Sequence, residues 1–169
     1  MPLKDSLIVY EDVIKLDTSY KKEILFKSTK TWFINNSQSL NTLISYEDHP
    51  SGKIIGNAII HIPVSLYILG YLGKKCTFSI QLDIKDGKYK YKIYDFIESI
   101  EYPHDKIVKI DVSDRYLKYL RGDYKAVGFV GKKRLSSDFD ESFKNMDDQI
   151  RQLINSINVA LKSGKPEDF

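Results

Sequence analysis

The residues best suited to chemistry in this sequence are three histidines and one cysteine. His49 falls in a turn-like segment, His61 ends a strand-like segment, and His104 stands next to Asp105. No two of these histidines have the spacing expected for ligands of one metal ion. Cys76 is the sole cysteine, so it forms neither an intramolecular disulfide nor a cysteine-based metal cluster. The sequence therefore predicts no metal site and no cofactor.

Two short motifs match catalytic signatures only in part. Ser19 and Lys22 have the Ser-x-x-Lys spacing, but the Ser-Asp-Asn and Lys-Thr-Gly motifs that accompany it in penicillin-binding enzymes are absent. Ser19 stands where a helix is expected to begin, so we interpret it as a helix cap, together with Asp17 and Thr18. "GFVGKKR", residues 128–134, lacks the glycine-to-lysine spacing of a phosphate-binding loop.

The acidic residues give no further sign of catalysis. Glu47 and Asp48 adjoin His49, but in a segment that reads as a solvated turn before a proline. Glu98 and Glu101 are interpreted as surface acids. They give no sign of paired-carboxylate catalysis, because that chemistry needs a cleft, which sequence does not reveal. We therefore predict that the protein is not an enzyme.

Composition indicates an ordinary globular chain. Its 169 residues are 42% hydrophobic and 29% charged, and 26 basic against 23 acidic residues leave a net charge of +3. This balance does not by itself imply a polyanionic partner, and no nucleic-acid partner is expected. No apolar run approaches the roughly 20 residues of a transmembrane helix, and the start has no signal-peptide core. The expected location is cytoplasmic, or exported with a leader already removed.

The clearest local pattern is a β-hairpin centred on Asp86-Gly87. Both residues are expected to adopt positive φ in a type I′ turn. Alternation then places one set of side chains on a buried face: Ile80, Leu82, Ile84, Tyr89, Tyr91 and Ile93. The lysines between the tyrosines, Lys90 and Lys92, point to solvent together with Tyr94.

Five other elements are predicted outside the irregular segment. Strands are predicted over residues 7–15, 39–48 and 52–62, and an amphipathic helix carrying Trp32 over residues 20–36. A long helix over residues 137–163 carries an apolar stripe that includes Phe143 and Ile150. Residues 101–137 read as irregular, with a short helix over 113–122 capped by Ser113 or Asp114.

Together these elements predict an α+β fold of order βαββββα. An antiparallel sheet with two helices packed on one face is the simplest way to bury both apolar stripes. We expect a single domain over residues 1–169, with its core at about 7–98 and 137–163 and an irregular insert at about 101–137 before the last helix.

Four stretches carry a resemblance to a known family: "LIVYEDVIKL", "SYKKEILFKSTKTWF", "SGKIIGNAII" and "IKDGKYKYKIYDF". They resemble an uncharacterised domain-of-unknown-function family, numbered four-four-six-eight, with a TATA-binding-protein-like fold. The resemblance covers about residues 7–98 and implies the same βαββββα order. It also implies bacterial export, hence a periplasmic or other extracytoplasmic location. It transfers no catalytic residues.

The expected function is that of a non-enzymatic binding or scaffolding domain of the bacterial envelope. If Gly56 and Ala58 face inward, Ile55, Ile59 and His61 face outward, and this outer sheet face is apolar enough to attract a protein partner or a second copy. The residues proposed to bind the partner are Ile55, Ile59, His61, Lys90, Lys92 and Tyr94. Alternatively, the insert covers this face or the strand has the opposite register. Other candidate functions are a nucleic-acid-binding module or a small-ligand carrier.

Overall fold

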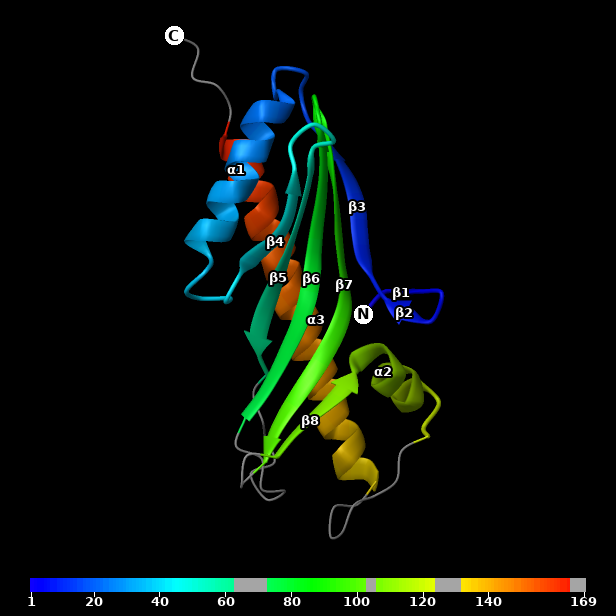
Figure 1. The fold of residues 1–169 in the computed structure, drawn as a ribbon. Coiled ribbons are helices and arrows are strands. Elements are labelled where there is room, and N and C mark those ends of the chain that lie inside the picture. The colour runs from blue at the N-terminus through cyan, green and yellow to red at the C-terminus, as the bar shows by residue number, and fades with distance from the viewer. Residues whose placement is uncertain (63–72, 103–105, 124–131, 165–169) are drawn as a thin grey trace. The chain divides into compact units, whose positions relative to one another are not determined.

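The computed structural model describes residues 1–62, 73–102, 106–123 and 132–164 (Figure 1). Its elements in chain order are β1 (Leu3–Lys4), β2 (Leu7–Ile8), β3 (Tyr10–Lys15), α1 (Lys22–Asn35), β4 (Leu43–Asp48), β5 (Lys53–His61), β6 (Gly73–Lys85), β7 (Lys88–Tyr102), β8 (Lys106–Asp111), α2 (Val112–Leu120) and α3 (Lys132–Ser163). The series from β3 to β7, followed by the long last helix, confirms the predicted βαββββα order.

Two predicted segments need correction. The single strand expected over residues 7–15 is divided into β2, which pairs with β1, and β3, which pairs with β7. The insert at 101–137 is more regular than expected, because it contains β8 and α2, and α3 begins at Lys132 rather than at 137. The strand considered over residues 124–134 falls mostly outside the described residues, and its last three residues are helical.

The main sheet has six strands in the order β3-β7-β6-β5-β4, with β8 also paired to β7. β3 pairs with the first part of β7, from Lys15 opposite Lys88 to Tyr10 opposite Ile93. β8 pairs with the last part, from Tyr102 to Ile97. Both pairings are antiparallel.

The chain divides into two compact units. Unit 1 contains Met1–Ile8, Ile60–Thr77 and Asp95–Ile150, and unit 2 contains Val9–Ile59, Phe78–Tyr94 and Arg151–Phe169. The long elements β6, β7 and α3 supply residues to both units. No helix of the described chain has the length and apolarity needed to cross a bilayer.

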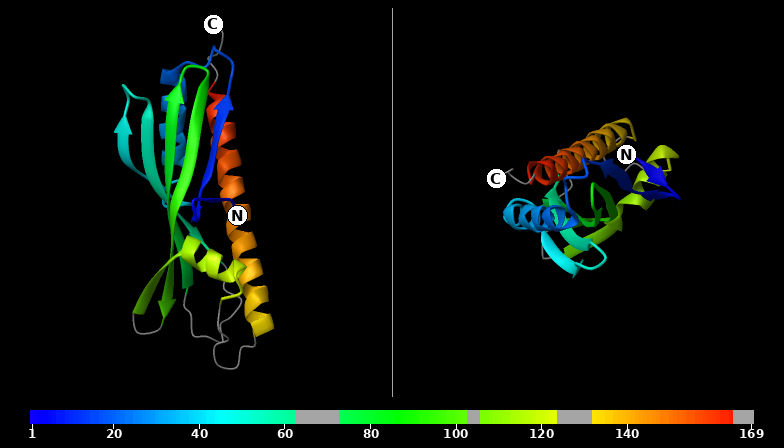
Figure 2. Two further views of the ribbon diagram at one scale, coloured as in Figure 1. Left: turned by 90° about the vertical axis from the view of Figure 1, so that its right-hand side faces the viewer. Right: turned by 90° about the horizontal axis from the view of Figure 1, so that it is seen from above.

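In unit 2, α1 and the C-terminal part of α3 lie on one face of the sheet, which we call the inner face (Figure 2). The hairpin alternation is confirmed, since all six side chains expected inside are buried. They face buried residues of the two helices, which are Leu25, Phe26, Thr29, Trp32, Phe33, Leu153, Ile157 and Leu161. Gly56 also faces inward as expected. A Cβ there would lie 2.4 Å from Phe33 Cε1, so only glycine allows this close approach.

The cap of α1 comes from a distant part of the chain. The N-cap residue is Lys21, and its side chain makes no capping bond. Instead, Asp86 at the hairpin tip accepts a hydrogen bond at 2.7 Å from the backbone N–H of Lys22. The prediction that Asp17, Thr18 or Ser19 caps this helix was wrong, because the chain supplies the acceptor from another element.

The turn type of the hairpin also differs from the prediction. Of its two turn residues, only Gly87 has positive φ, at 66°. A type I′ turn requires positive φ at both, so that prediction was wrong although the hairpin and its faces were right.

Unit 1 contains α2, the N-terminal part of α3, the first residues of β6 and the last residues of β7. Its buried apolar residues are Ile8, Ile60, Ile62, Cys76, Phe96, Ile100, Val112, Phe143, Met146 and Ile150. The N-cap of α2 is Asp111, whose carboxylate accepts from the N–H of Asp114 at 3.0 Å. The expected caps, Ser113 and Asp114, therefore lie inside the helix. Gly122 follows its end with φ 65°, as expected for a helix stop.

Both edge strands of unit 2 carry a feature that opposes further strand pairing. On β3, the carboxylate of Asp12 accepts from the backbone N–H of Val13 at 2.7 Å. Leu16 donates across to Gly87, so Val13, three residues earlier, points its N–H to the free edge. On β4, the pairing shifts between Ile44 and Tyr46, which leaves Ser45 as a β-bulge.

Candidate functional site

The candidate site is the outer face of the unit 2 sheet, opposite the two helices. Ile55 and Ile59 are half-buried on this face, while Gly56 and Ala58 between them are buried. The predicted register of β5 is therefore confirmed, and the opposite register is excluded.

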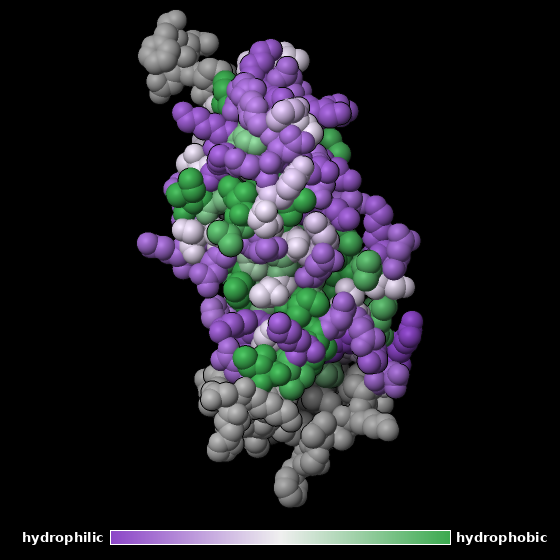
Figure 3. All heavy atoms as spheres, viewed as in Figure 1, coloured by the Kyte–Doolittle hydropathy of each residue, from purple (hydrophilic) through white to green (hydrophobic). Residues whose placement is uncertain are grey.

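Two further apolar side chains lie beside these isoleucines. Tyr46 of β4 pairs with Ile55 and is 49% exposed, and Leu43 pairs with Asn57 and is 69% exposed. We call Leu43, Tyr46, Ile55 and Ile59 the apolar patch. In Figure 3, hydrophobic residues on the viewed face lie on its α1 and β4 side and also in the lower part of the view, between hydrophilic ones.

Strand alternation alone does not place Leu43 and Tyr46 on this face. In a regular strand, residues three apart face opposite sides of the sheet. The bulge at Ser45 brings both to the outer face, because the extra residue inverts the alternation. No pattern in the sequence marks this bulge.

The other half of the face is mostly polar, although Val13 of β3, opposite Lys90, is 48% exposed. Lys90, Lys92 and Tyr94 lie on it as predicted, all of them half-buried. Lys90 Nζ lies 3.0 Å from Glu11 Oε2, and Lys92 Nζ lies 4.7 Å above the centre of the Tyr94 ring. The latter is a cation–π geometry.

The central strand β6 separates the two halves. Its outward residue Ser79 donates to Asn57 at 3.3 Å, and Asp83 lies 3.7 Å from Lys53 Nζ. Five of the six predicted binding residues thus share one face of unit 2. His61 belongs to unit 1, where it is exposed and its carbonyl oxygen accepts from Gln149 at 3.3 Å.

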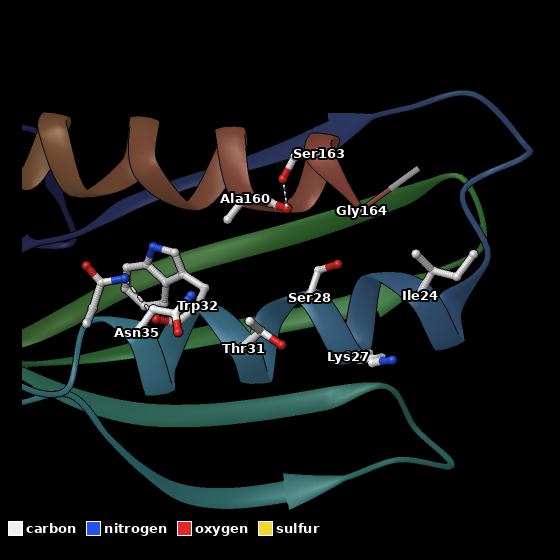
Figure 4. Close-up of a pocket in the computed structure, with 10 residues that line it drawn as sticks. Ile24, Lys27, Ser28, Thr31, Trp32, Asn35, Ala160, Ser163 and Gly164 are labelled. Carbon is white, nitrogen blue, oxygen red and sulfur yellow. Dashed lines mark hydrogen bonds between the residues drawn. The ribbon is translucent and has the colours of Figure 1, made fainter. Parts of the chain in front are cut away.

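A groove of about 460 Å³ lies between α1 and the end of α3 in unit 2 (Figure 4). Its lining is mostly uncharged and polar, with Lys27 as the one charged residue: Ile24, Lys27, Ser28, Thr31, Trp32, Asn35, Asn36, Ala160, Ser163 and Gly164. Trp32 offers little to a ligand, because its ring is 4% exposed and its indole N–H already donates to Ser156 at 3.0 Å. A small-ligand carrier, one of the other candidate functions, would need an apolar pocket, and the lining of this groove is mostly polar.

A buried ion cluster occupies unit 1. Glu98 is fully buried and forms ion pairs with Lys74 and Arg115. Lys74 also donates to Ser142 at 2.9 Å, and the Arg115 guanidinium lies 4.9 Å from the ring of Phe143. The interpretation of Glu98 as a surface acid was wrong.

The backbone of β7 explains this error. Tyr89, Tyr91 and Ile93 are buried at odd positions, whereas Phe96, Glu98 and Ile100 are buried at even positions. Asp95, with φ 58°, stands at the change of phase. Sequence alternation carried forward from the hairpin therefore places Glu98 on the wrong face.

The cluster has the chemistry of a structural ion network. Two cations are in ion-pair contact with the buried Glu98 carboxylate, and removing that carboxylate would leave both cations without their shared partner. The nearby thiol of Cys76 is also unreactive in character, since burial raises its pKa to about 12, against a smaller lowering by Arg115. Within the described ranges, no group of three or more histidine, cysteine or acidic side chains is placed to hold a metal ion.

A model of the family described as "Domain of unknown function (DUF4468) with TBP-like fold" matches residues 10–98. The chain belongs to this family. Two solved structures are similar to it. A TBP-like protein from Parabacteroides distasonis ATCC 8503 has 12% identity and a TM-score of 0.61, over 93% of this chain and 96% of that one. A DUF4468 family protein from Bacteroides ovatus ATCC 8483 has 14% identity and a TM-score of 0.62, over 99% and 92%.

At these identities the two structures establish the TBP-like fold of the DUF4468 chain and nothing about its role. No curated protein matches the sequence.

Proposed function

We propose that this DUF4468 chain is a non-enzymatic binding or scaffolding domain of a bacterial exported or envelope protein, and that the outer face of unit 2 contacts a protein partner. The observation that carries the proposal is the exposure of the apolar patch, where Leu43 and Tyr46 are 69% and 49% exposed. Exposed apolar side chains that adjoin on one rigid sheet face are typical of a protein contact.

The surroundings of the patch support a protein partner over nucleic acid. TATA-binding protein bends DNA with apolar wedges inserted between base steps. The central strand of the face here presents Ser79, Gln81 and Asp83, which are all polar and include an acid. Glu11 and Asp83 also neutralise two lysines of the face, which weakens its attraction for a phosphate backbone.

The test is the double substitution Ile55→Lys and Ile59→Lys. We expect the variant to stay folded by far-UV circular dichroism and to lose its partner, whether that is a second copy seen by sedimentation velocity or an envelope protein retained on the immobilised chain. The control is Ile34→Lys with Val159→Lys, which adds the same two charges on residues of α1 and α3 that are 67% and 59% exposed. If the wild type and the double variant bind the partner equally, the outer face is not the interface.

Export has a separate test. Antibody detection of the protein in fractionated cells of its native bacterium should place it outside the cytoplasm. Recovery in the cytoplasmic fraction alone would leave the binding proposal standing and refute the location.

A further inference from the structure

Three exposed lysines form a row across neighbouring strands at the hairpin end of the outer face in unit 2. Lys15 of β3 lies directly opposite Lys88 of β7. Lys88 and Lys85 flank the two-residue turn between β7 and β6. All three side chains are exposed. We call Lys15, Lys85 and Lys88 the lysine row.

This arrangement is unfavourable for the isolated chain. Like charges directly opposite each other on adjacent strands destabilise a sheet. Among the residues that the structure describes, no carboxylate lies within ion-pair distance of any of the three. The acids nearest in sequence are otherwise engaged, since Asp17 accepts from the N–H of Ser19 at 2.8 Å and Asp86 caps α1.

Other lysines on the same face have acidic partners. Lys90 is paired with Glu11 at 3.0 Å, and Lys53 with Asp83 at 3.7 Å. Lys92 has Glu11 directly opposite it on β3 and lies 4.7 Å above the Tyr94 ring. The positive charge that has no acid beside it is therefore concentrated at the row. A sheet that neutralises some lysines and groups others without counterions offers a local complement to an anionic partner.

We propose that the lysine row binds an acidic segment of the partner protein. This inference rests on the proposed function, because it names the chemistry of the partner on the same outer face. A short run of carboxylates matches a row of three ammonium groups, whose flexible stems adapt to carboxylates of varied spacing. A nucleic-acid backbone or an anionic membrane would spread its charge over the whole face and would meet Glu11 and Asp83 as well.

The apolar patch lies on the same face of the same unit. A partner with acidic and apolar residues would use both, so that charge sets orientation and association rate while apolar burial slows dissociation. The row and the patch can be tested separately, because their residues do not overlap.

The experiment measures binding of a fluorescein-labelled peptide of four consecutive glutamates to the full chain by anisotropy at low and at physiological ionic strength. We expect saturable, salt-sensitive binding that weakens by about tenfold or more in the Lys85→Glu, Lys88→Glu variant. The control is Lys27→Glu with Lys162→Glu, which changes the net charge equally but lies on α1 and α3. It should keep the affinity within about twofold.

Three results of the peptide experiment would overturn the proposal: no saturable peptide binding, equal loss in both charge variants, or tighter binding of duplex DNA or of phosphatidylserine vesicles than of the peptide. Circular dichroism of every variant confirms that the fold is intact. If the peptide still binds the Ile55→Lys, Ile59→Lys variant but that variant shows no loss of its protein partner, the proposed function fails while the row remains a site. If the patch variant loses its partner and the row variant does not, only the present inference fails.

Discussion

The two units fill their cores with different chemistry. The buried polar residues described in unit 2 are two threonines, Thr29 and Thr42, and its remaining core is apolar. Unit 1 instead buries the carboxylate of Glu98 between Lys74 and Arg115. An apolar core loses stability in proportion to the atoms removed, whereas an ion cluster depends on every partner being present.

The chain carries its own probe for each unit. Its one tryptophan, Trp32, is buried in unit 2, and its one cysteine, Cys76, is buried in unit 1. Tryptophan fluorescence and thiol labelling therefore report separately on the two cores.

The largest expected effect is that of Glu98→Ala. It leaves the mostly buried Lys74 and Arg115 side chains, 12% and 13% exposed, without their shared counterion, so we expect a loss of about 3 to 5 kcal/mol in the free energy of unfolding. Denaturant titration followed by Cys76 labelling measures it. The matched control is Glu101→Ala, because Glu101 pairs with Lys75 in a half-exposed position and should contribute less than about 1 kcal/mol. Similar losses for the two variants would show that the cluster is not an interdependent network.

In unit 2, Leu82→Ala should cost about 2 to 5 kcal/mol, since Leu82 is fully buried on the inner face. The volume-conserving change Leu82→Met should cost less than about 1.5 kcal/mol. Trp32 fluorescence during urea unfolding measures both. A Leu82→Met loss as large as that of Leu82→Ala would remove the contrast between the cores, because it would mean that unit 2 tolerates no repacking.

A smaller effect is expected from Asp86→Ala, which removes the cap that the hairpin gives to α1. Loss of a capping side chain typically costs about 0.5 to 2 kcal/mol. Asp86→Asn keeps an acceptor oxygen and should recover most of this, as measured by thermal unfolding. Ser19→Ala serves as the control, because Ser19 was the cap suggested by sequence. A larger loss of thermal stability for Ser19→Ala than for Asp86→Ala would mean that Ser19, and not Asp86, caps α1.

The smallest expected effect concerns the thiol of Cys76, which should not react in the native protein. Burial raises the pKa of Cys76 to about 12, so at pH 8 the native protein should not react with a disulfide reagent on the timescale in which the urea-unfolded chain reacts fully. Absorbance of the released thiolate follows the reaction. Immediate labelling of native protein would mean that the unit 1 core opens readily.

The contrast between the units also explains what the sequence could predict. In unit 2, regular alternation from Ile80 to Ile93 revealed both sheet faces, because a strand has a fixed period of two. The apolar spacing around Trp32 likewise revealed the buried side of α1. These are local patterns, and they were confirmed.

Two kinds of feature could not be predicted from the sequence: those created where the in–out alternation of a strand is inverted, and those created by a contact between distant residues. The positive φ of Asp95 moves Glu98 inward, and the bulge at Ser45 moves Leu43 and Tyr46 to the same face. The contact of Asp86 with Lys22 joins residues 64 positions apart. Five residues of the outer-face site followed from alternation: Ile55, Ile59, Lys90, Lys92 and Tyr94. Its most exposed apolar members, Leu43 and Tyr46, did not.

The features at the two strand edges of unit 2 bear on the kind of assembly that the domain can form. A free strand edge adds copies one after another, so edge pairing generates open fibres of no fixed size. The Asp12 carboxylate over the Val13 N–H and the bulge at Ser45 oppose this at both ends of the unit 2 sheet. The proposed contact through the outer face would occupy the surface that makes it, so the resulting complex would have a defined stoichiometry.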